Sequence, residues 1–237
     1  FCSPKSFNNY LGVPLSLSEL NVAHQFGIFE VGMSKAGEIH SLSKLIKPHI
    51  GIITNIGEAH IENFKNLNGI AKAKSEIINN IKKDGTLILN RDDKYFNYFK
   101  KKAKTRRLKI VTFSKFKKAD IQMFKVNKTK KYQKIFVTFK NKILKLEINN
   151  VNAYNVLASL AVLKELNLDP KHIVPVLKKI YPSKGRGRIY NINRYKRNFK
   201  LIDESYNASP HSVKNAIQTF SEIKKKNFKK YLILGDM

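Results

Sequence analysis

Residues 49–56 of this 237-residue chain read HIGIITNI, and two further apolar runs follow, TLILN (86–90) and KIVTFS (109–114). The runs are continuously apolar and do not alternate with polar residues, and a helical pattern at 67–83 separates the first two. Strands buried on both faces have this character, and they occur in parallel sheets whose faces are covered by helices. We therefore predict an α/β fold with a mostly parallel sheet flanked by helices.

The patterns on either side of these runs extend the prediction. Upstream, FGIFEVG (26–32) predicts another strand of the same kind. Downstream, residues 121–149 alternate β-branched and charged residues, as in KIFVTFKNKILKLEI, which is typical of a small antiparallel meander with one solvated face. An apolar stripe then predicts a helix at 152–166, and Pro170 opens a shorter helix that ends near Tyr181.

The segment PSKGRGR (182–188) contains two glycines, a proline and three cations, and no core residue. We predict a domain boundary there, between residues 1–184 and residues 185–237. Strand and helix patterns follow the boundary, and YLILGDM (231–237) predicts a returning parallel strand. Residues 185–237 are therefore expected to open a second, Rossmann-like α/β domain.

The charge of the chain is strongly positive, with 46 Lys+Arg against 17 Asp+Glu and a formal net charge of +29. Such an excess favours anionic partners, nucleic acid among them. However, the lysines are scattered along the whole chain, and the sequence contains no zinc-finger spacing, RGG tract or RNP-type aromatic motif. We therefore predict solvated surface lysines and no nucleic-acid binding.

The single cysteine, Cys2, excludes an internal disulfide and a multi-cysteine metal cluster, which fits a reducing compartment. No apolar run approaches the roughly eighteen residues that a membrane helix needs, and no leader-like segment opens the sequence. We expect a cytoplasmic monomer without a membrane span.

Several polar residues follow the predicted strands, where an open parallel sheet binds its ligands. Glu30 ends the run at 26–32, His60 lies a few residues after the run at 49–56, and Glu204 follows a strand of the second domain. Taken singly, Glu30 is most simply a carboxylate that caps a nearby helix, and His60 a hydrogen-bonded or exposed histidine. Together, the carboxylate of Glu30 and the imidazole of His60 could bind a divalent cation such as Mg²⁺.

Lys74 lies on the apolar side of a predicted helix, four residues after Ile70 and four before Ile78. A lysine in this position either extends its ammonium group to solvent or has a lowered pKa and a chemical role. A neutral lysine reacts with CO₂ to form a carbamate, which is a carboxylate-like metal ligand. The residues alone favour the first of these two interpretations.

Five motifs, in this order and spacing, resemble the Mur ligases: NNYLGVPLSL (8–17), EVGMSKAGEI (30–39), ITNIGEAHIENFKNLNGIAKAKSEI (53–77), IDESYNASP (202–210) and LGDM (234–237). The first and fourth motifs are similar to those of the members that join D-alanyl-D-alanine to UDP-N-acetylmuramoyl-tripeptide. The resemblance implies an ATP-dependent amide-bond ligase of peptidoglycan precursor synthesis that works through an acyl phosphate.

The resemblance also implies roles for individual residues. Glu30, His60 and Lys74 match the ligands of Mg²⁺, and Lys74 matches a lysine that is carbamylated in these enzymes. Lys74, His60 and Arg186 are thereby implied as catalytic residues. Asn8 and Asn9 match residues placed near the muramoyl substrate, and Asn207 is assigned to the substrate site with them.

The resemblance places the ATP contacts on three residues: Asn155 at the adenine, Arg186 at the phosphates and Glu204 at the ribose. The sequence departs from the family pattern at Val151, where histidine is usual, at Glu204, where aspartate is commoner, and at Ser209, where asparagine is usual. These departures weaken the local assignments and leave the metal site untouched.

The chain contains no G-x-x-x-x-G-K-[ST] loop, which in the family lies upstream of the NN motif. We expect this loop and the uridine-binding domain to precede the chain, most of the C-terminal domain to follow it, and the 237-residue chain alone to be inactive. Two alternatives stay open. One is a related Mur-type ligase with another amino-acid acceptor, and the other is a basic nucleic-acid-binding module with its cations on one face.

Overall fold

The structure is a computed structural model. It describes residues 1–58, 61–128, 132–149, 151–206, 208, 210–221, 223 and 229–235.

The three apolar runs form neighbouring parallel strands, as predicted. They are β1 (Ile50–Ile53), β2 (Thr86–Asn90) and β3 (Lys109–Ser114), and β2 lies between the other two. All five residues of β2 are buried, which explains why this strand is apolar without alternation.

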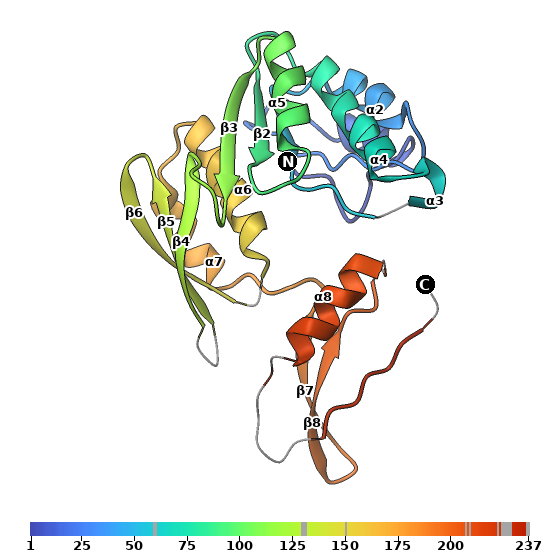
Figure 1. Cartoon of the computed structure of the whole chain (residues 1–237), viewed down its shortest axis with the longest axis vertical. Helices are drawn as coiled ribbons and strands as arrows, with labels where there is room; N and C mark the ends of the chain where they lie inside the picture. Colours follow the sequence, from blue (N-terminus) through green and yellow to red (C-terminus); the bar gives the residue numbers. More distant parts are fainter. Residues whose placement is uncertain are drawn as a thin grey trace.

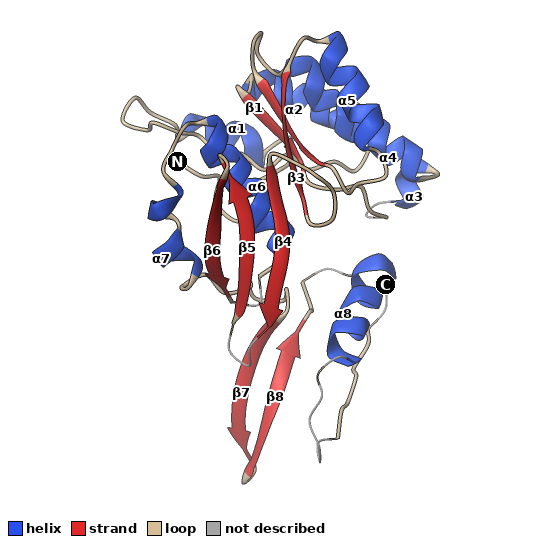
Figure 2. Ribbon diagram, turned by 60° about the vertical axis from the view of Figure 1, so that its left-hand side comes forward, coloured by secondary structure: helices blue, strands red, loops and turns tan. Residues whose placement is uncertain are grey.

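An antiparallel meander continues the same sheet, which has the strand order β1-β2-β3-β4-β5-β6 (Figure 2). The added strands are β4 (Ile121–Lys128), β5 (Gln133–Phe139) and β6 (Lys142–Ile148). β4 pairs in parallel with β3, whereas the β4–β5 and β5–β6 pairings are antiparallel. Along β5 every second residue is buried, so the predicted one-sided meander is confirmed.

Helices cover both faces of the parallel strands (Figure 1). On one face, Ile88 of β2 belongs to the core formed with α6 (Ala153–Glu165) and the meander. On the other face, Leu87 and Leu89 pack with residues of α4 (Leu67–Lys74) and α5 (Phe96–Thr105). Because successive side chains of a strand point to opposite faces, one short apolar run supplies both cores.

The predicted helix at 67–83 begins as α4, with the Asn66 side chain accepting a hydrogen bond from the Gly69 amide, and continues as a 3₁₀ helix, η1 (Ser75–Asn80). The predicted helix at 152–166 is α6, and the Asn152 side chain caps its first turn. The remaining helices before the linker are α1 (Gly12–Ser18), α2 (Glu38–Ile46), α3 (Ile61–Phe64), η2 (Pro170–His172) and α7 (Val174–Leu177).

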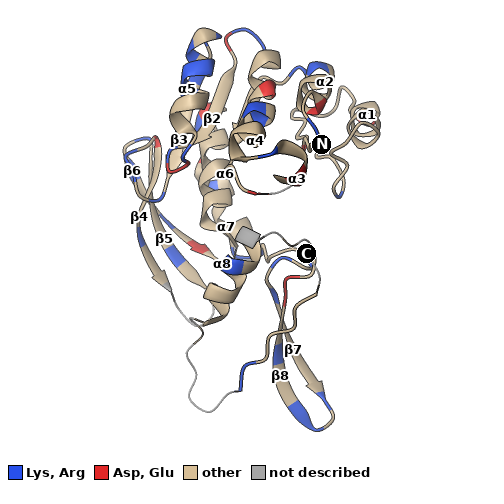
Figure 3. Ribbon diagram, turned by 45° about the vertical axis from the view of Figure 1, so that its right-hand side comes forward, with Lys and Arg blue, Asp and Glu red and all other residues tan. Residues whose placement is uncertain are grey.

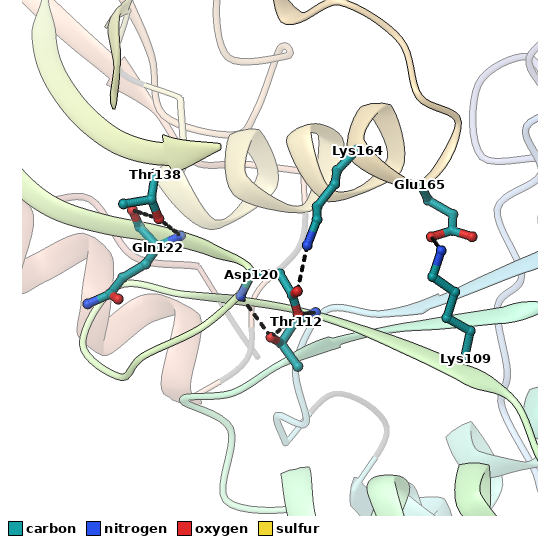
Figure 4. A network of polar contacts seen from close by, with 7 residues as sticks. All are labelled: Lys109, Thr112, Asp120, Gln122, Thr138, Lys164 and Glu165. Carbon is teal, nitrogen blue, oxygen red and sulfur yellow. Dashed lines mark hydrogen bonds and ion pairs between the residues drawn. The ribbon is translucent and has the colours of Figure 1, made fainter. Parts of the chain in front are cut away.

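Polar contacts fasten the end of α6 to the sheet (Figure 4). The carboxylate of Asp120 accepts hydrogen bonds from the amide and hydroxyl of Thr112, at 2.9 and 2.6 Å, and forms an ion pair with Lys164 of α6 at 2.5 Å. The next residue, Glu165, pairs with Lys109 at 2.8 Å and accepts a hydrogen bond from the buried Thr86 hydroxyl at 2.8 Å. These contacts fix the last turn of α6 against the beginnings of β2 and β3.

Residues 188–221 form a hairpin and a helix. The hairpin pairs β7 (Arg188–Arg194) with β8 (Arg197–Asp203) in antiparallel register, and α8 (Pro210–Ser221) follows. Figure 1 shows this part apart from the six-stranded sheet. Both predicted strands and the helix of this region are therefore present.

Two predicted strands are wrong. Residues 26–32 form one isolated bridge, between Cys2 and Ile28, and Ile28 is 63% exposed. The six-stranded sheet ends at β1, so residues 26–32 do not pair with one of its strands. In the described part of the run YLILGDM, residues 231–235 are not in a strand, and Ile233 is 91% exposed. An apolar run forms a strand only where a neighbouring strand pairs with it.

None of the helices in the described part of the chain combines the length and apolar character that crossing a bilayer requires.

Candidate active site

The carboxyl ends of β1, β2 and β3 lie at one edge of the sheet, and polar residues follow all three strands. Asn55 follows β1, Asp92 and Asp93 follow β2, and Ser114 ends β3. The Ile56 amide donates a hydrogen bond of 2.8 Å to Asp93 Oδ2, which ties the segment after β1 to the turn after β2. This is the edge at which an open parallel sheet binds its ligands.

Lys74 reaches this edge from the end of α4. Its Nζ donates a hydrogen bond to the backbone carbonyl of Asn55 at 3.1 Å, and the side chain is half-buried. Burial lowers the pKa of the Lys74 ammonium group, and the negative charge of Asp93 opposes this effect in part. Lys74 is thus held among polar groups beyond the strand ends. Because its pKa is lowered, its ammonium group loses a proton more readily than that of a surface lysine.

Glu30 lies exposed on the N-terminal segment, beside Asn8. Asn8 Nδ2 donates a hydrogen bond to Glu30 Oε1 at 2.8 Å, and the Asn8 carbonyl accepts one from the Gly32 amide at 2.8 Å. A Cβ at Gly32 would lie 2.9 Å from the Asn8 side chain, so only glycine allows this approach. Two of the expected site residues, Asn8 and Glu30, are therefore brought into direct contact.

Asn9 has a structural partner instead. Its Oδ1 accepts hydrogen bonds from the amides of Leu11 and Gly12, at 3.2 and 2.9 Å, where α1 begins. These contacts direct the Asn9 side chain to the helix start, whereas the neighbouring Asn8 side chain contacts Glu30.

His60 and Asn207, together with Ser209, lie outside the described residues, so the expected pairing of Glu30 with His60 stays a prediction. In the described ranges, no three His, Cys, Asp or Glu side chains gather closely enough to hold a metal ion.

The beginning of α6 lies next to the same edge. Asn152 Oδ1 accepts a hydrogen bond from the Tyr154 amide at 3.0 Å, and the Asn155 side chain is exposed. The Tyr154 hydroxyl donates a hydrogen bond to Asp92 Oδ2 at 3.1 Å. The first turn of α6 is thereby linked to the turn after β2.

Asp92 is a site residue that the sequence analysis did not single out. Burial alone would raise the pKa of its carboxyl group, but hydrogen bonds from Ser114, Lys115, Tyr154 and Phe116 outweigh burial and lower it. The sequence shows that Asp92 follows the run TLILN, but it does not show the donors that converge on this carboxylate.

Arg186 lies in the linker, and Glu204 follows the last residue of β8 directly. The Arg186 guanidinium carbon lies 4.4 Å from the centroid of the Tyr206 ring, within cation–π range. The Tyr206 hydroxyl lies 2.5 Å from Ser6 Oγ, so this contact joins the linker region to the N-terminal segment. Gly187 has a φ of +83°, and a Cβ there would lie 3.0 Å from Glu204 Oε1.

The pKa values of the two neighbouring carboxyl groups, Asp203 and Glu204, are shifted in opposite directions. Hydrogen bonds from the Ser205 side chain and amide and from the Gly185 amide lower the pKa of Asp203. Burial raises the pKa of Glu204, and the charge of Asp203 adds to the effect. Asp203 therefore serves to fix the linker, whereas Glu204 has no hydrogen bond to another described residue and is available for a ligand.

Basic residues are spread over distant parts of the molecule. Figure 3 shows lysine and arginine on α5, on the meander strands and on the hairpin β7–β8. This distribution differs from the single basic face that a nucleic-acid-binding module would carry.

These features define a class of protein, an α/β domain with polar residues at the carboxyl edge of a mostly parallel sheet. A glycine-containing linker joins this domain to the hairpin and helix of residues 188–221.

Residues 2–163 match the Mur ligase middle domain, and the chain belongs to the Mur ligase family. The UDP-N-acetylmuramoyl-tripeptide--D-alanyl-D-alanine ligase of Rickettsia prowazekii (strain Madrid E) is 32% identical over 100% of this chain and 52% of its own length. The ligase of the same name from Bacillus subtilis (strain 168) is 32% identical over 98% of this chain and 49% of its own length. The chain thus spans about half the length of the curated relatives it matches.

The crystal structure of MurF from Acinetobacter baumannii is similar in fold, with a TM-score of 0.83 and 27% sequence identity. The similarity covers 94% of this chain and 48% of that chain. The predicted fold class, a central Mur ligase domain with a mostly parallel sheet and an antiparallel meander, is confirmed.

Proposed function

We propose that this chain is part of an ATP-dependent ligase that joins D-alanyl-D-alanine to UDP-N-acetylmuramoyl-tripeptide. The observation that carries the proposal is the extent of the similarity, since relatives of that name match 98–100% of the chain, on both sides of the linker. A relative that shared only the central domain would leave the segment after Arg186 unmatched.

In the proposed reaction, the terminal carboxylate of the tripeptide attacks the γ-phosphate of ATP, which forms an acyl phosphate and releases ADP. The amine of D-alanyl-D-alanine then attacks the acyl carbon, loses a proton, and expels inorganic phosphate. Negative charge increases in both steps, and preorganised positive charge stabilises it. Arg186, a guanidinium on the linker, is the described cation that we assign to the phosphates.

Mg²⁺ is the metal that we propose for this site, with Glu30, His60 and carbamylated Lys74 as its ligands. The described residues fit: Glu30 supplies an exposed carboxylate, and the lowered pKa of Lys74 favours the neutral amine that CO₂ requires. A bound Mg²⁺ would supply charge neutralisation of the phosphates. The carbamate itself would turn a cation at the carboxyl edge into an anion, and its nitrogen would keep one N–H that can donate to the Asn55 carbonyl.

We assign Asn155 to the adenine base, Glu204 to the ribose and Asn8, Asn9 and Asn207 to the muramoyl substrate. Support differs among them: the side chains of Asn155 and Glu204 are exposed, and Asn8 already contacts Glu30. Asn9 has the weaker support, because its oxygen holds the beginning of α1. We further propose a cytoplasmic monomer, since nucleotide-linked precursors and ATP are soluble substrates.

The test is a coupled assay of ADP release by the full-length protein. We expect release that requires UDP-N-acetylmuramoyl-tripeptide and D-alanyl-D-alanine together. Release with a different amino-acid acceptor, and none with the dipeptide, would instead identify a Mur-type ligase of another acceptor. ATP turnover that does not depend on UDP-N-acetylmuramoyl-tripeptide would overturn the proposal.

A further inference from the structure

The carboxylate of Asp92 is the meeting point of three elements at the carboxyl edge of the sheet. Ser114 Oγ donates to Oδ1 at 2.7 Å, and the amides of Lys115 and Phe116 donate to Oδ2 at 2.6 and 3.3 Å. The Tyr154 hydroxyl donates to the same Oδ2 at 3.1 Å. Asp92 thus connects the turn after β2 with the end of β3 and with the first turn of α6.

The charge states of the pair suit this connection. The hydrogen bonds that converge on Asp92 keep its carboxyl group ionised. Burial and the charge of Asp92 raise the pKa of Tyr154, so the phenol stays protonated and remains a donor. A hydrogen bond from a neutral hydroxyl to a charged carboxylate is stronger than one between neutral groups.

The ring of Tyr154 is also held by packing. It meets Phe113 edge to face, with centroids 6.5 Å apart, and Lys115 Nζ lies 4.1 Å from its centroid. These contacts restrict the orientation of the ring, and the hydroxyl ties the first turn of α6 to the turn after β2.

Asn155 follows Tyr154 directly, about 100° further around the helix. Its side chain is exposed, and its amide group makes no hydrogen bond to another described residue. Since Tyr154 faces the sheet and Asn155 faces outward from the same turn, a shift of the one moves the other. A free, outward-facing amide at the carboxyl edge is suited to the edge of a purine base.

We infer that Asp92 is a positioning residue for nucleotide binding, which holds Tyr154 and, through it, presents the Asn155 amide to the adenine base. The inference rests on the proposed function, in which Asn155 contacts adenine. It adds a role for two residues, Asp92 and Tyr154, to which the proposed function assigns no ligand contact.

The test is Tyr154→Phe in the full-length protein, which keeps the ring and removes the hydroxyl. We expect the KM for ATP to rise about five- to tenfold, equivalent to about 1–1.4 kcal/mol of binding free energy. The kcat at saturating ATP and the KM for D-alanyl-D-alanine should stay within about twofold of wild type. Calorimetric titration with ADP should show the same loss of affinity.

Thr86→Val is the matched control, because it removes a hydroxyl bond to the same helix at the other end of β2. The Thr86 hydroxyl donates to Glu165 in the last turn of α6. We expect this variant to lower the melting temperature without changing the KM for ATP. If both variants raise that KM equally, Asp92 and Tyr154 merely support the helix, and the inference is overturned.

The remaining outcomes are also decisive. Wild-type protein without ATP turnover would count against the proposed function, and the ADP affinity of Tyr154→Phe relative to wild type would then decide the role of Asp92. Active wild type with an unchanged KM in Tyr154→Phe would overturn the inference alone. If Tyr154→Phe does not fold, Asp92→Asn replaces it, since an amide keeps the size but cannot accept every converging donor, and the same rise in KM is expected.

Discussion

The sheet of residues 50–148 and the hairpin of residues 188–203 use similar residues with different results. Ile88 of β2 is fully buried in the core that the sheet forms with α6, whereas Ile189 of β7 is 41% exposed. Both are isoleucines within a β-strand, so the strand propensity of the residue does not separate them. The difference is the covering layer: α4, α5 and α6 enclose the parallel strands, whereas the hairpin keeps much of its surface open. Burial, and with it most of the stabilisation, is a property of the assembled layers.

The largest effect should fall on the polar edge of the sheet. Lys74→Arg in the full-length protein keeps the positive charge but cannot form a carbamate, since arginine does not lose its proton. We expect ligase activity to fall at least about 100-fold with an unchanged circular dichroism spectrum. Lys101→Arg, on the exposed side of α5, is the control and should be fully active. An active Lys74→Arg protein would return Lys74 to the interpretation of a lysine that only extends to solvent.

The comparison of the two isoleucines is directly testable. Ile88→Ala should lower the free energy of unfolding by about 2–5 kcal/mol, because it leaves a cavity between α6 and the sheet. Ile189→Ala should lower it by less than about 1 kcal/mol, since the side chain is already partly solvated. Urea unfolding measures both. Equal losses would mean that Ile189 is covered in solution, and the difference in burial between the sheet and the hairpin would then be wrong.

A smaller, pH-dependent effect is expected at Asp120, which ties α6 to β3. Burial would raise the pKa of this carboxyl group, but hydrogen bonds from Lys164 and Thr112 outweigh burial and lower it. A folded-state pKa below the unfolded value of about 3.9 stabilises the protein above that pH, and the stabilisation is lost as the pH falls through the folded pKa.

We therefore expect Asp120→Asn to cost about 1 kcal/mol at pH 7, a value reduced for the partial exposure of the ion pair. The gap between variant and wild type should close below about pH 4. Melting curves across pH measure it, with Glu19→Gln, an exposed carboxylate next to α1, as the control. A gap that stays constant down to pH 2 would contradict the assignment of the effect to the Asp120 charge.

The smallest effect concerns the contact between the two regions. Tyr206→Phe removes the hydroxyl that contacts Ser6 and keeps the ring beside Arg186. We expect a loss of at most about 0.5–1 kcal/mol, the value of one exposed hydrogen bond. Tyr195→Phe, in the exposed hairpin turn, should change nothing measurable. A loss of several kcal/mol in Tyr206→Phe would show that the regions are tightly coupled.

The buried part of the fold was predictable from the sequence because its pattern and its environment agree. β2 and β3 are apolar where they are covered, and β5 alternates where one face is open. The runs at 26–32 and 231–235 have the same apolar character, but pairing depends on a neighbour that no local pattern reveals. The apolar pattern therefore predicted two strands, near the two ends of the described chain, that the structure does not contain.

The candidate site was predictable only where one residue carries the signal. Lys74 stood out because a cation on an apolar stripe is unusual, and the structure places it at the strand ends. Asp92 did not stand out, because its importance comes from donors at positions 114–116 and 154. Such convergence depends on the fold and has no counterpart in sequence spacing.

The short pairing between β3 and β4 affects the order in which the chain folds. These strands pair at Phe113–Ile121 and Ser114–Gln122, whereas β5 and β6 pair along their whole length across a tight turn. Contacts between close sequence neighbours form fastest, since they close short loops. The meander is therefore expected to assemble early as a local nucleus, and β1, whose partner β2 lies more than thirty residues away, to dock late. In a newly made chain, the pairing of β1 with β2 would therefore form last. The polar groups that follow β1 and β2 would come together only at that step.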